Sequence, residues 1–347
     1  MRIGILSGAV RETEILQRAV ALQPEHRLLW SAKTGAEAVT RCAMETPDVV
    51  LLDLLVGRKD GLEATRQITA SGQCAVLIVT GSVVEHSAHV FDVMGHGALD
   101  VVEMPAWSSG SARESAAPLL GKLAMIARLI SEKSEVPIPP AVRDCESRAA
   151  PEQMLVAIGA SAGGPKALAT LLRALPKDFP AAIVIVQHVE AQFANGMADW
   201  LSEQSAVPVA VAKERDCPEA GRVLLAGTGD HLALKRANRL GYTPEPRDYA
   251  YRPSIDVFFD SVSRLWRGDA VGVLLTGMGR DGAIGLKALR NRGHHTIAQD
   301  QASSAVYGMP KAAAALKAAV DILPMERIAA RLIDVVVGNI AGFPSRL

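Results

Sequence analysis

The chain has 347 residues, 49% of them hydrophobic but only 4% aromatic, and its 37 Lys plus Arg residues equal its 37 Asp plus Glu residues. This length suits two domains, and the balanced charge supplies no net field for nucleic acid or an anionic membrane, so neither is an expected partner. The cysteines at positions 42, 74, 145 and 217 have neither disulfide-framework nor metal-ligand spacing, and no run approaches the ~20 apolar residues of a membrane span. Because residues 1–6 are also too short for a signal peptide, we expect a cytoplasmic protein without membrane insertion.

Residues 1–133 alternate short aliphatic runs with amphipathic segments. The runs predict strands at residues 3–6, 49–52, 75–79 and 98–102, and the periodic segments predict helices at 12–21 and 35–45. Apolar residues then recur at helical spacing from 119 to 130, which predicts a closing helix. Strands separated by helices favour βαβ units and a parallel sheet.

Residues 134–151 contain four prolines and show little periodicity, so they are interpreted as a short linker. A second α/β domain is predicted over residues 152–347, doubly wound and mostly parallel. Within it, residues 223–226 and 231–234 flank the turn-forming segment 227–230, which predicts that these two strands form an antiparallel hairpin and join the sheet.

Three motifs in the second domain place reactive side chains after aliphatic runs. They are Gly159-Ala160-Ser161-Ala162-Gly163-Gly164, Gln187-His188, and Thr276-Gly277-Met278-Gly279-Arg280-Asp281-Gly282. Open α/β sheets gather their chemistry at the carboxyl ends of the strands. A serine, a histidine and an aspartate there would activate a hydroxyl nucleophile, which predicts a serine hydrolase. The backbone N–H groups of Ala162 and Met278 are the expected donors to an oxyanion.

Less specific interpretations compete for each motif. A glycine-rich turn can simply bind phosphate, which would make the chain a non-enzymatic docking or phosphate-binding module. His188 alone could be a structural histidine, and Asp281 could cap the helix expected from residue 283. An α/β-hydrolase acting on a small ester would instead use the order Ser, Asp, His, with Asp230 or Asp256 followed by His294 or His295.

Long ordered motifs resemble the catalytic domain of CheB-type protein-glutamate methylesterases over nearly all of residues 152–325. They are segments 156–164, 186–188, 252–257, 274–282, 298–300 and 307–310. The resemblance implies a nucleophile at Ser161, a base at His188 and an orienting acid at Asp281. It also implies hydrolysis of glutamyl methyl esters on chemoreceptors, often with deamidation of glutamines, without a metal or organic cofactor for catalysis. The family often has Met-Pro after the histidine, whereas Val189-Glu190 stands here.

The first domain resembles a response-regulator receiver, which implies a flavodoxin-like five-stranded parallel sheet and a chemotaxis-type histidine kinase as partner. Asp53 then corresponds to the phospho-accepting aspartate and Thr80 to the switch hydroxyl, and segment 94–100 resembles the surface-sensing, chemosensory-like branch. The acid pair that would hold a divalent cation is replaced by Ser7 and Gly8, and the receiver lysine by Met104. One carboxylate is a poor octahedral site, so we expect poor Mg²⁺-dependent phosphorylation of Asp53. In the family the receiver covers the esterase site, and we expect the same steric inhibition here.

Overall fold

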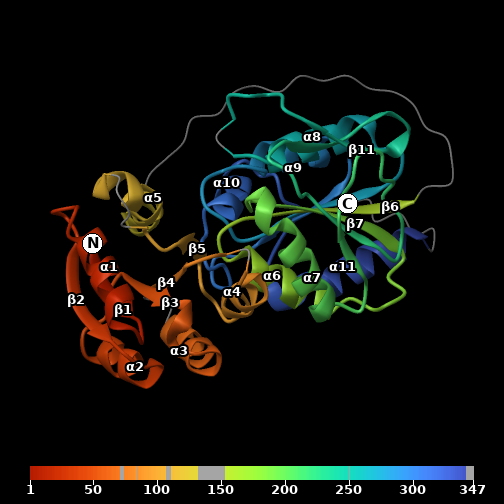
Figure 1. Ribbon diagram of the computed structural model, residues 1–347. Helices are drawn as coiled ribbons and strands as arrows, with labels where there is room; N and C mark the ends of the chain where they lie inside the picture. The colour runs from red at the N-terminus through yellow and green to blue at the C-terminus, as the bar shows by residue number, and fades with distance from the viewer. Residues whose placement is uncertain (71–73, 84, 107–110, 132–152, 250, 341–347) are drawn as a thin grey trace.

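The computed structural model describes residues 1–70, 74–83, 85–106, 111–131, 153–249 and 251–340. The predicted linker at residues 134–151 therefore lies outside the described residues. The described chain forms two parallel sheets, with helices on both faces of each (Figure 1). No helix in these ranges combines the length and the apolar composition that crossing a membrane requires.

The N-terminal sheet has five parallel strands in the order β2-β1-β3-β4-β5, which is the flavodoxin-like order. The strands are β1 (Arg2–Leu6), β2 (Arg27–Ala32), β3 (Val49–Asp53), β4 (Ala75–Thr80) and β5 (Asp100–Glu103). The helices are α1 (Val10–Val20), α2 (Gly35–Met44), α3 (Arg58–Ala70), α4 (Ser87–Gly95) and α5 (Ala112–Ser131). Compared with the predicted elements, β5 starts two residues later, and β2, α3 and α4 were not predicted individually.

The C-terminal sheet has seven strands in the order β14-β13-β12-β6-β7-β9-β8, and every neighbouring pair is parallel. The strands are β6 (Met154–Ala160), β7 (Ala181–Gln187), β8 (Val209–Val211), β9 (Val223–Leu225), β12 (Ala270–Leu274), β13 (His295–Gln299) and β14 (Asp321–Leu323). Helices α6 (Gly164–Arg173), α7 (Ala194–Gln204) and α11 (Met325–Ile340) cover one face. Helices α8 (Ile255–Leu265), α9 (Ala283–Asn291) and α10 (Met309–Ala315) cover the other.

The predicted pairing of residues 223–226 with residues 231–234 is wrong. Strand β9 is buried on both faces and pairs in parallel with β7 and β8, as a short continuous apolar run does inside a parallel sheet. The antiparallel hairpin is instead formed by β10 (His231–Leu234) and β11 (Leu240–Thr243), which make a separate two-stranded sheet. This hairpin packs on α8 and therefore stands beside the sheet rather than in it.

The two parallel-sheet units share an apolar contact. Helix α4 of the first unit packs against α6 and α7 of the second, and these segments lie next to one another in Figure 1. The Trp200 indole on α7 lies 6.1 Å from the Phe91 ring on α4, measured between ring centroids, and its Nε1–H donates to Asp92 Oδ1 at 3.0 Å. A Cβ added at Gly95 would lie 2.7 Å from the Trp200 ring, so the glycine permits this close approach.

Candidate active site

The three reactive motifs meet at one edge of the C-terminal sheet because their strands are neighbours. Strand β6 lies between β12 and β7, and all three run in the same direction. Ser161 directly follows β6 and His188 directly follows β7, while Asp281 stands in the loop between β12 and α9. The sequence pattern therefore predicted both the edge and the residues found there.

The three side chains form a continuous hydrogen-bond chain. His188 Nδ1 lies 3.0 Å from Ser161 Oγ, and His188 Nε2 lies 2.8 Å from Asp281 Oδ2. Because an ionised carboxylate only accepts, the proton of a neutral imidazole resides on Nε2, and Nδ1 is left as the acceptor for the serine proton. The phenol ring of Tyr251 stacks on the imidazole with centroids 4.4 Å apart and planes 3° from parallel, which fixes the plane of the base.

The Asp281 carboxylate is bound by the first turn of α8. Oδ1 accepts from the Ser254 hydroxyl at 2.8 Å and from the Asp256 N–H at 3.0 Å, and Oδ2 accepts from the Ile255 N–H at 2.7 Å. Burial alone would raise the pKa of Asp281, but the hydrogen bond and charge attraction of His188, together with these N–H donors, hold that pKa below its usual range. Asp281 is therefore a buried anion that faces the base, and it does not cap α9, where Gly282 occupies the N-cap position.

The two N–H groups predicted as oxyanion donors lie beside Ser161. In the described ranges, the N–H groups of Ala162 and Met278 have no hydrogen-bond acceptor. The loop after β12 packs closely against Ser161: a Cβ added at Gly277 would lie 2.7 Å from Ser161 Cβ. Thr276 connects the loop after β6 with the loop after β13. Its hydroxyl donates to Ala162 O at 3.0 Å and accepts from the Val306 N–H at 2.9 Å. Two free donors held rigidly at this place can stabilise a developing oxyanion.

The rival arrangement with His294 or His295 as base is not formed. His295 begins β13 and pairs in register with Val271, near the amino end of β12, so both histidines lie at the sheet edge opposite Ser161. His294 Nδ1 accepts from the Ala270 N–H at 3.2 Å, and His295 Nε2 lies 2.8 Å from Asp321 Oδ2. Asp230 stands in the turn before β10, and Asp256 accepts from the Gly285 N–H at 2.7 Å. The alternative of a Ser, Asp, His order is therefore not supported.

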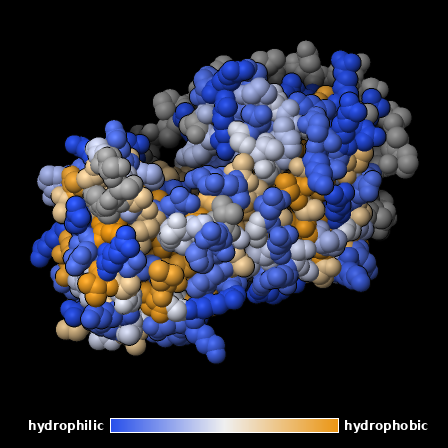
Figure 2. Space-filling model, viewed as in Figure 1, coloured by the Kyte–Doolittle hydropathy of each residue, from blue (hydrophilic) through white to orange (hydrophobic). Residues whose placement is uncertain are grey.

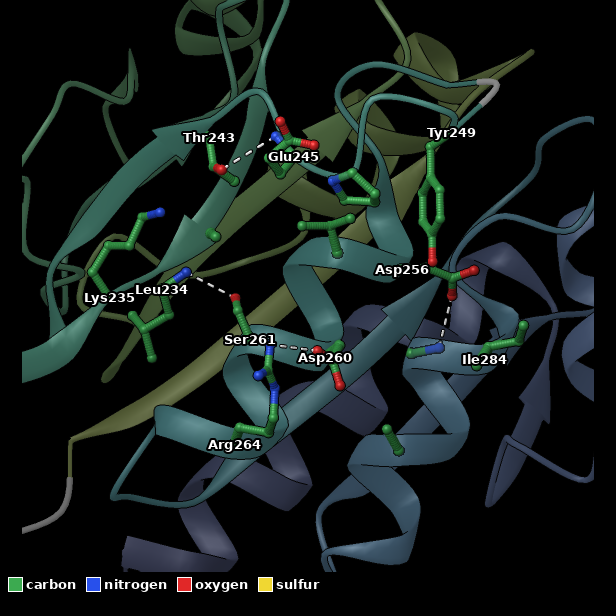
Figure 3. Close-up of a pocket in the computed structure, with 15 residues that line it drawn as sticks. Leu234, Lys235, Thr243, Glu245, Tyr249, Asp256, Asp260, Ser261, Arg264 and Ile284 are labelled. Atoms are coloured by element: carbon green, nitrogen blue, oxygen red, sulfur yellow. Dashed lines mark hydrogen bonds and ion pairs between the residues drawn. The ribbon is translucent and has the colours of Figure 1, made fainter. Parts of the chain in front are cut away.

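A cavity of about 510 Å³ lies behind the triad, between the β10–β11 hairpin and the helices α8 and α9. Figure 3 shows Asp256 in its wall, with Tyr249 directed towards it and Ser261 deeper along α8. Burial and the charge of the neighbouring Asp281 raise the pKa of Asp256 to about 7. None of Ser161, His188 and Asp281 lines this cavity.

Asp53 ends β3 and is buried, with 1% of its surface exposed. Its carboxylate accepts from the Ser7 hydroxyl at 2.7 Å and from the Leu55 N–H at 3.0 Å. Burial raises the pKa of Asp53 in spite of these two donors.

The surface of the same unit carries exposed apolar side chains. Val10 and Leu55 are 67% and 61% exposed. Figure 2 shows apolar side chains gathered on the surface of this N-terminal unit.

The residues around Asp53 do not fit a Mg²⁺ ion. Ser7 stands where an acid is expected, and its hydroxyl donates a hydrogen bond to Asp53 Oδ2. This bond occupies a carboxylate oxygen that a bound cation would need. In the described part of the chain, no group of three or more His, Cys, Asp or Glu residues is arranged to hold a metal ion. The Thr80 hydroxyl is engaged close to its own strand end, 3.4 Å from His86 Nδ1.

The first unit also reaches the active-site edge. Ala162 and Val306 belong to the same apolar cluster as the buried face of the five-stranded sheet, and Met104 and Met278 pack against that cluster. Ser161 is 9% exposed. Met104, which stands where a receiver has its lysine, thus packs against the apolar cluster to which Ala162 also belongs.

Comparison with known proteins supplies relatives for both units. The sequence profile described as CheB methylesterase matches residues 156–332, and the one described as response regulator receiver domain matches residues 13–107. A protein-glutamate methylesterase/protein-glutamine glutaminase of Pseudomonas putida is 55% identical over 96% of this chain and 99% of its own length. Another, from Pseudomonas aeruginosa, is 54% identical over 96% of this chain and 99% of its own. The crystal structure of the Thermotoga maritima CheB methylesterase catalytic domain superposes with a TM-score of 0.51 at 33% identity, covering 53% of this chain and 98% of that one.

Proposed function

The chain belongs to the CheB methylesterase family, and we propose that it hydrolyses glutamyl methyl esters and deamidates glutamines on chemoreceptors through Ser161, His188 and Asp281. The observation that carries this proposal is the hydrogen-bond chain of 3.0 Å and 2.8 Å that joins the three side chains. The names of the relatives at about 55% identity over nearly the whole chain supply the substrate class.

The geometry supports acyl transfer. His188 Nδ1 removes the proton of Ser161 as the hydroxyl oxygen attacks the γ-carbonyl of the substrate side chain. Asp281 stabilises the imidazolium that forms, and the N–H groups of Ala162 and Met278 bind the oxyanion. Methanol leaves from an ester, or ammonia from a glutamine, with the proton returned by His188. Water then hydrolyses the acyl-enzyme, and the product in both cases is glutamate.

Substitution of the nucleophile tests the proposal. Purified Ser161→Ala protein should release no methanol from methylated receptor, while the wild type releases it catalytically. Ser304→Ala is the matched control, because its hydroxyl lies at the same sheet edge but donates only to Asp300 O, at 2.6 Å. If Ser161→Ala retains wild-type methanol release, another group is the nucleophile.

The first unit has a regulatory role in this proposal. The apolar cluster around Ala162 and the low exposure of Ser161 support a receiver-like domain that limits access of the receptor to the site. A chemotaxis-type histidine kinase is the expected partner of such a domain, but the surroundings of Asp53 argue against Mg²⁺-dependent phosphorylation. Control would then come from a partner that binds the domain, or the domain would be a fixed lid. A cytoplasmic location accords with the free thiols of Cys42, Cys74 and Cys217.

A further inference from the structure

A buried histidine outside the triad is connected to the triad acid. His231, at the start of β10, has no exposed surface. Its Nδ1 accepts from the Ser254 N–H at 3.0 Å, and its Nε2 lies 3.0 Å from Pro246 O. Since a carbonyl oxygen only accepts, Nε2 carries the proton and the ring is the neutral tautomer with Nδ1 as acceptor.

Ser254 links His231 to Asp281 by hydrogen bonds. It is the N-cap of α8: its Oγ accepts from the Val257 N–H at 3.3 Å and donates to Asp281 Oδ1 at 2.8 Å. The Ser254 hydroxyl therefore accepts a hydrogen bond from the helix backbone and donates one to the Asp281 carboxylate at the same time. Ser254 is fully buried, so water does not replace either bond.

The hairpin holds α8 at a second point. The Leu234 N–H at the end of β10 donates to Ser261 Oγ at 2.8 Å, two turns along the helix from Ser254 (Figure 3). Strand β10 therefore runs beside α8 and is hydrogen-bonded to it at both ends, through His231 and Leu234. Because the first turn of α8 provides three donors to Asp281, the position of the hairpin fixes the position of the carboxylate.

We infer that His231 and Ser254 are positioning residues for the reaction: they hold Asp281 in the orientation that keeps the His188 imidazole in its working tautomer and plane. This inference rests on the proposed esterase function. In the described part of the chain, neither residue hydrogen-bonds to Ser161 or His188, so both act through Asp281. Their effect is on the step in which His188 becomes charged, since that step needs the carboxylate in hydrogen-bond reach of Nε2. Misplacement of a catalytic group by about 1 Å can lower the rate about 100-fold, so loss of either residue should lower kcat by roughly 10- to 100-fold and leave KM nearly unchanged.

Paired variants at each position separate positioning from simple stability. Ser254→Ala removes both the donor to Asp281 and the helix cap, whereas Ser254→Thr retains a hydroxyl for both. His231→Gln loses the acceptor at the place of Nδ1, whereas His231→Asn retains an oxygen there for the Ser254 N–H. Thr34→Ala is the matched control for a lost cap, because Thr34 caps α2 by accepting from the Glu37 N–H at 3.3 Å, far in sequence from the triad.

Methanol release and thermal unfolding are measured on each full-length variant, together with the low-field proton resonance of the His188–Asp281 hydrogen bond. We expect Ser254→Ala and His231→Gln to lose kcat and to shift or lose that resonance. Ser254→Thr and His231→Asn should recover most of both, and Thr34→Ala should lower stability alone. The inference is overturned if folded Ser254→Ala and His231→Gln keep kcat within about threefold of the wild type, or if Ser254→Thr is as slow as Ser254→Ala. An inactive wild type would instead contradict the esterase function itself.

Discussion

The contact between α4 and α7 predicts how strongly the receiver-like unit restrains the esterase. Trp200 on α7 is 5% exposed, and its Nε1–H donates to Asp92 Oδ1 at 3.0 Å across the contact. Asp92 also forms an ion pair with Arg58, which belongs to the same unit. The substitution Trp200→Phe keeps an aromatic ring against Phe91 and removes the donor to Asp92, so it weakens the contact without changing the triad.

The size of the effect follows from this one hydrogen bond. A bond to a charged group contributes about 1.5 to 3 kcal/mol, and we expect the lower end because the Asp92 side chain is 22% exposed and keeps Arg58. A loss of about 1.5 kcal/mol raises the ratio of open to closed molecules about tenfold. If the closed form dominates and is inactive towards receptor, kcat/KM for methylated receptor should rise about tenfold.

The assay is methanol release from methylated receptor by full-length protein. Trp266→Phe is the matched control, since Trp266 is 7% exposed and its Nε1–H donates at 3.1 Å to Asp269 O within the esterase unit. That variant should leave kcat/KM within about twofold of the wild type. Equal rates for Trp200→Phe and wild type, or a gain shared by Trp266→Phe, would refute the restraint by α4.

Three further outcomes are expected. Gly277→Ala should abolish most activity, because the added Cβ would lie 2.7 Å from Ser161 Cβ. The esterase assay together with a thermal melt checks this, and normal activity would contradict the close packing of Gly277 against Ser161. The pKa of Asp256 is raised from 3.8 to about 7, so its protonated form stabilises the folded state. This contribution to the unfolding free energy is fully present below pH ~4 and is lost as the pH rises through 7. Between pH 5 and 8, the unfolding free energy of the wild type should therefore fall by roughly 2 to 3 kcal/mol more than that of Asp256→Asn in urea titrations, and equal slopes would contradict the raised pKa. Acetyl phosphate with Mg²⁺ should label Asp53 poorly in phosphate-affinity gels, and ready labelling with a gain of activity would show a working receiver.

The triad edge was predictable because its strands are continuous apolar runs. Strands β6 and β7 are buried along their whole length, so hydrophobicity marks them, and the residues that follow must lie at the sheet edge. Strand β2 was missed because it lies at the edge of its sheet and only two of its six residues are buried. The pairing of β9 was mistaken because a turn-like sequence does not reveal which strand lies alongside.

Contacts between distant loops carried no periodic signal. Tyr251 stacks on His188 from a loop more than sixty residues away, and His231 reaches Ser254 from a separate hairpin. No sequence pattern pointed to Trp200, whose indole N–H donates to Asp92, 108 positions earlier in the chain. Such residues are recognised only when the folded chain shows what each of them touches.

Covalent labelling shows directly whether Ser161 is an activated nucleophile. Full-length protein is treated with a fluorophosphonate probe, digested and analysed by mass spectrometry, alongside Ser161→Ala and His188→Gln. We predict one adduct on Ser161 in the wild type, none in Ser161→Ala, and much slower labelling in His188→Gln, because His188 Nδ1 lies 3.0 Å from Ser161 Oγ. An unlabelled wild type, or an adduct on another serine that persists in Ser161→Ala, would contradict it.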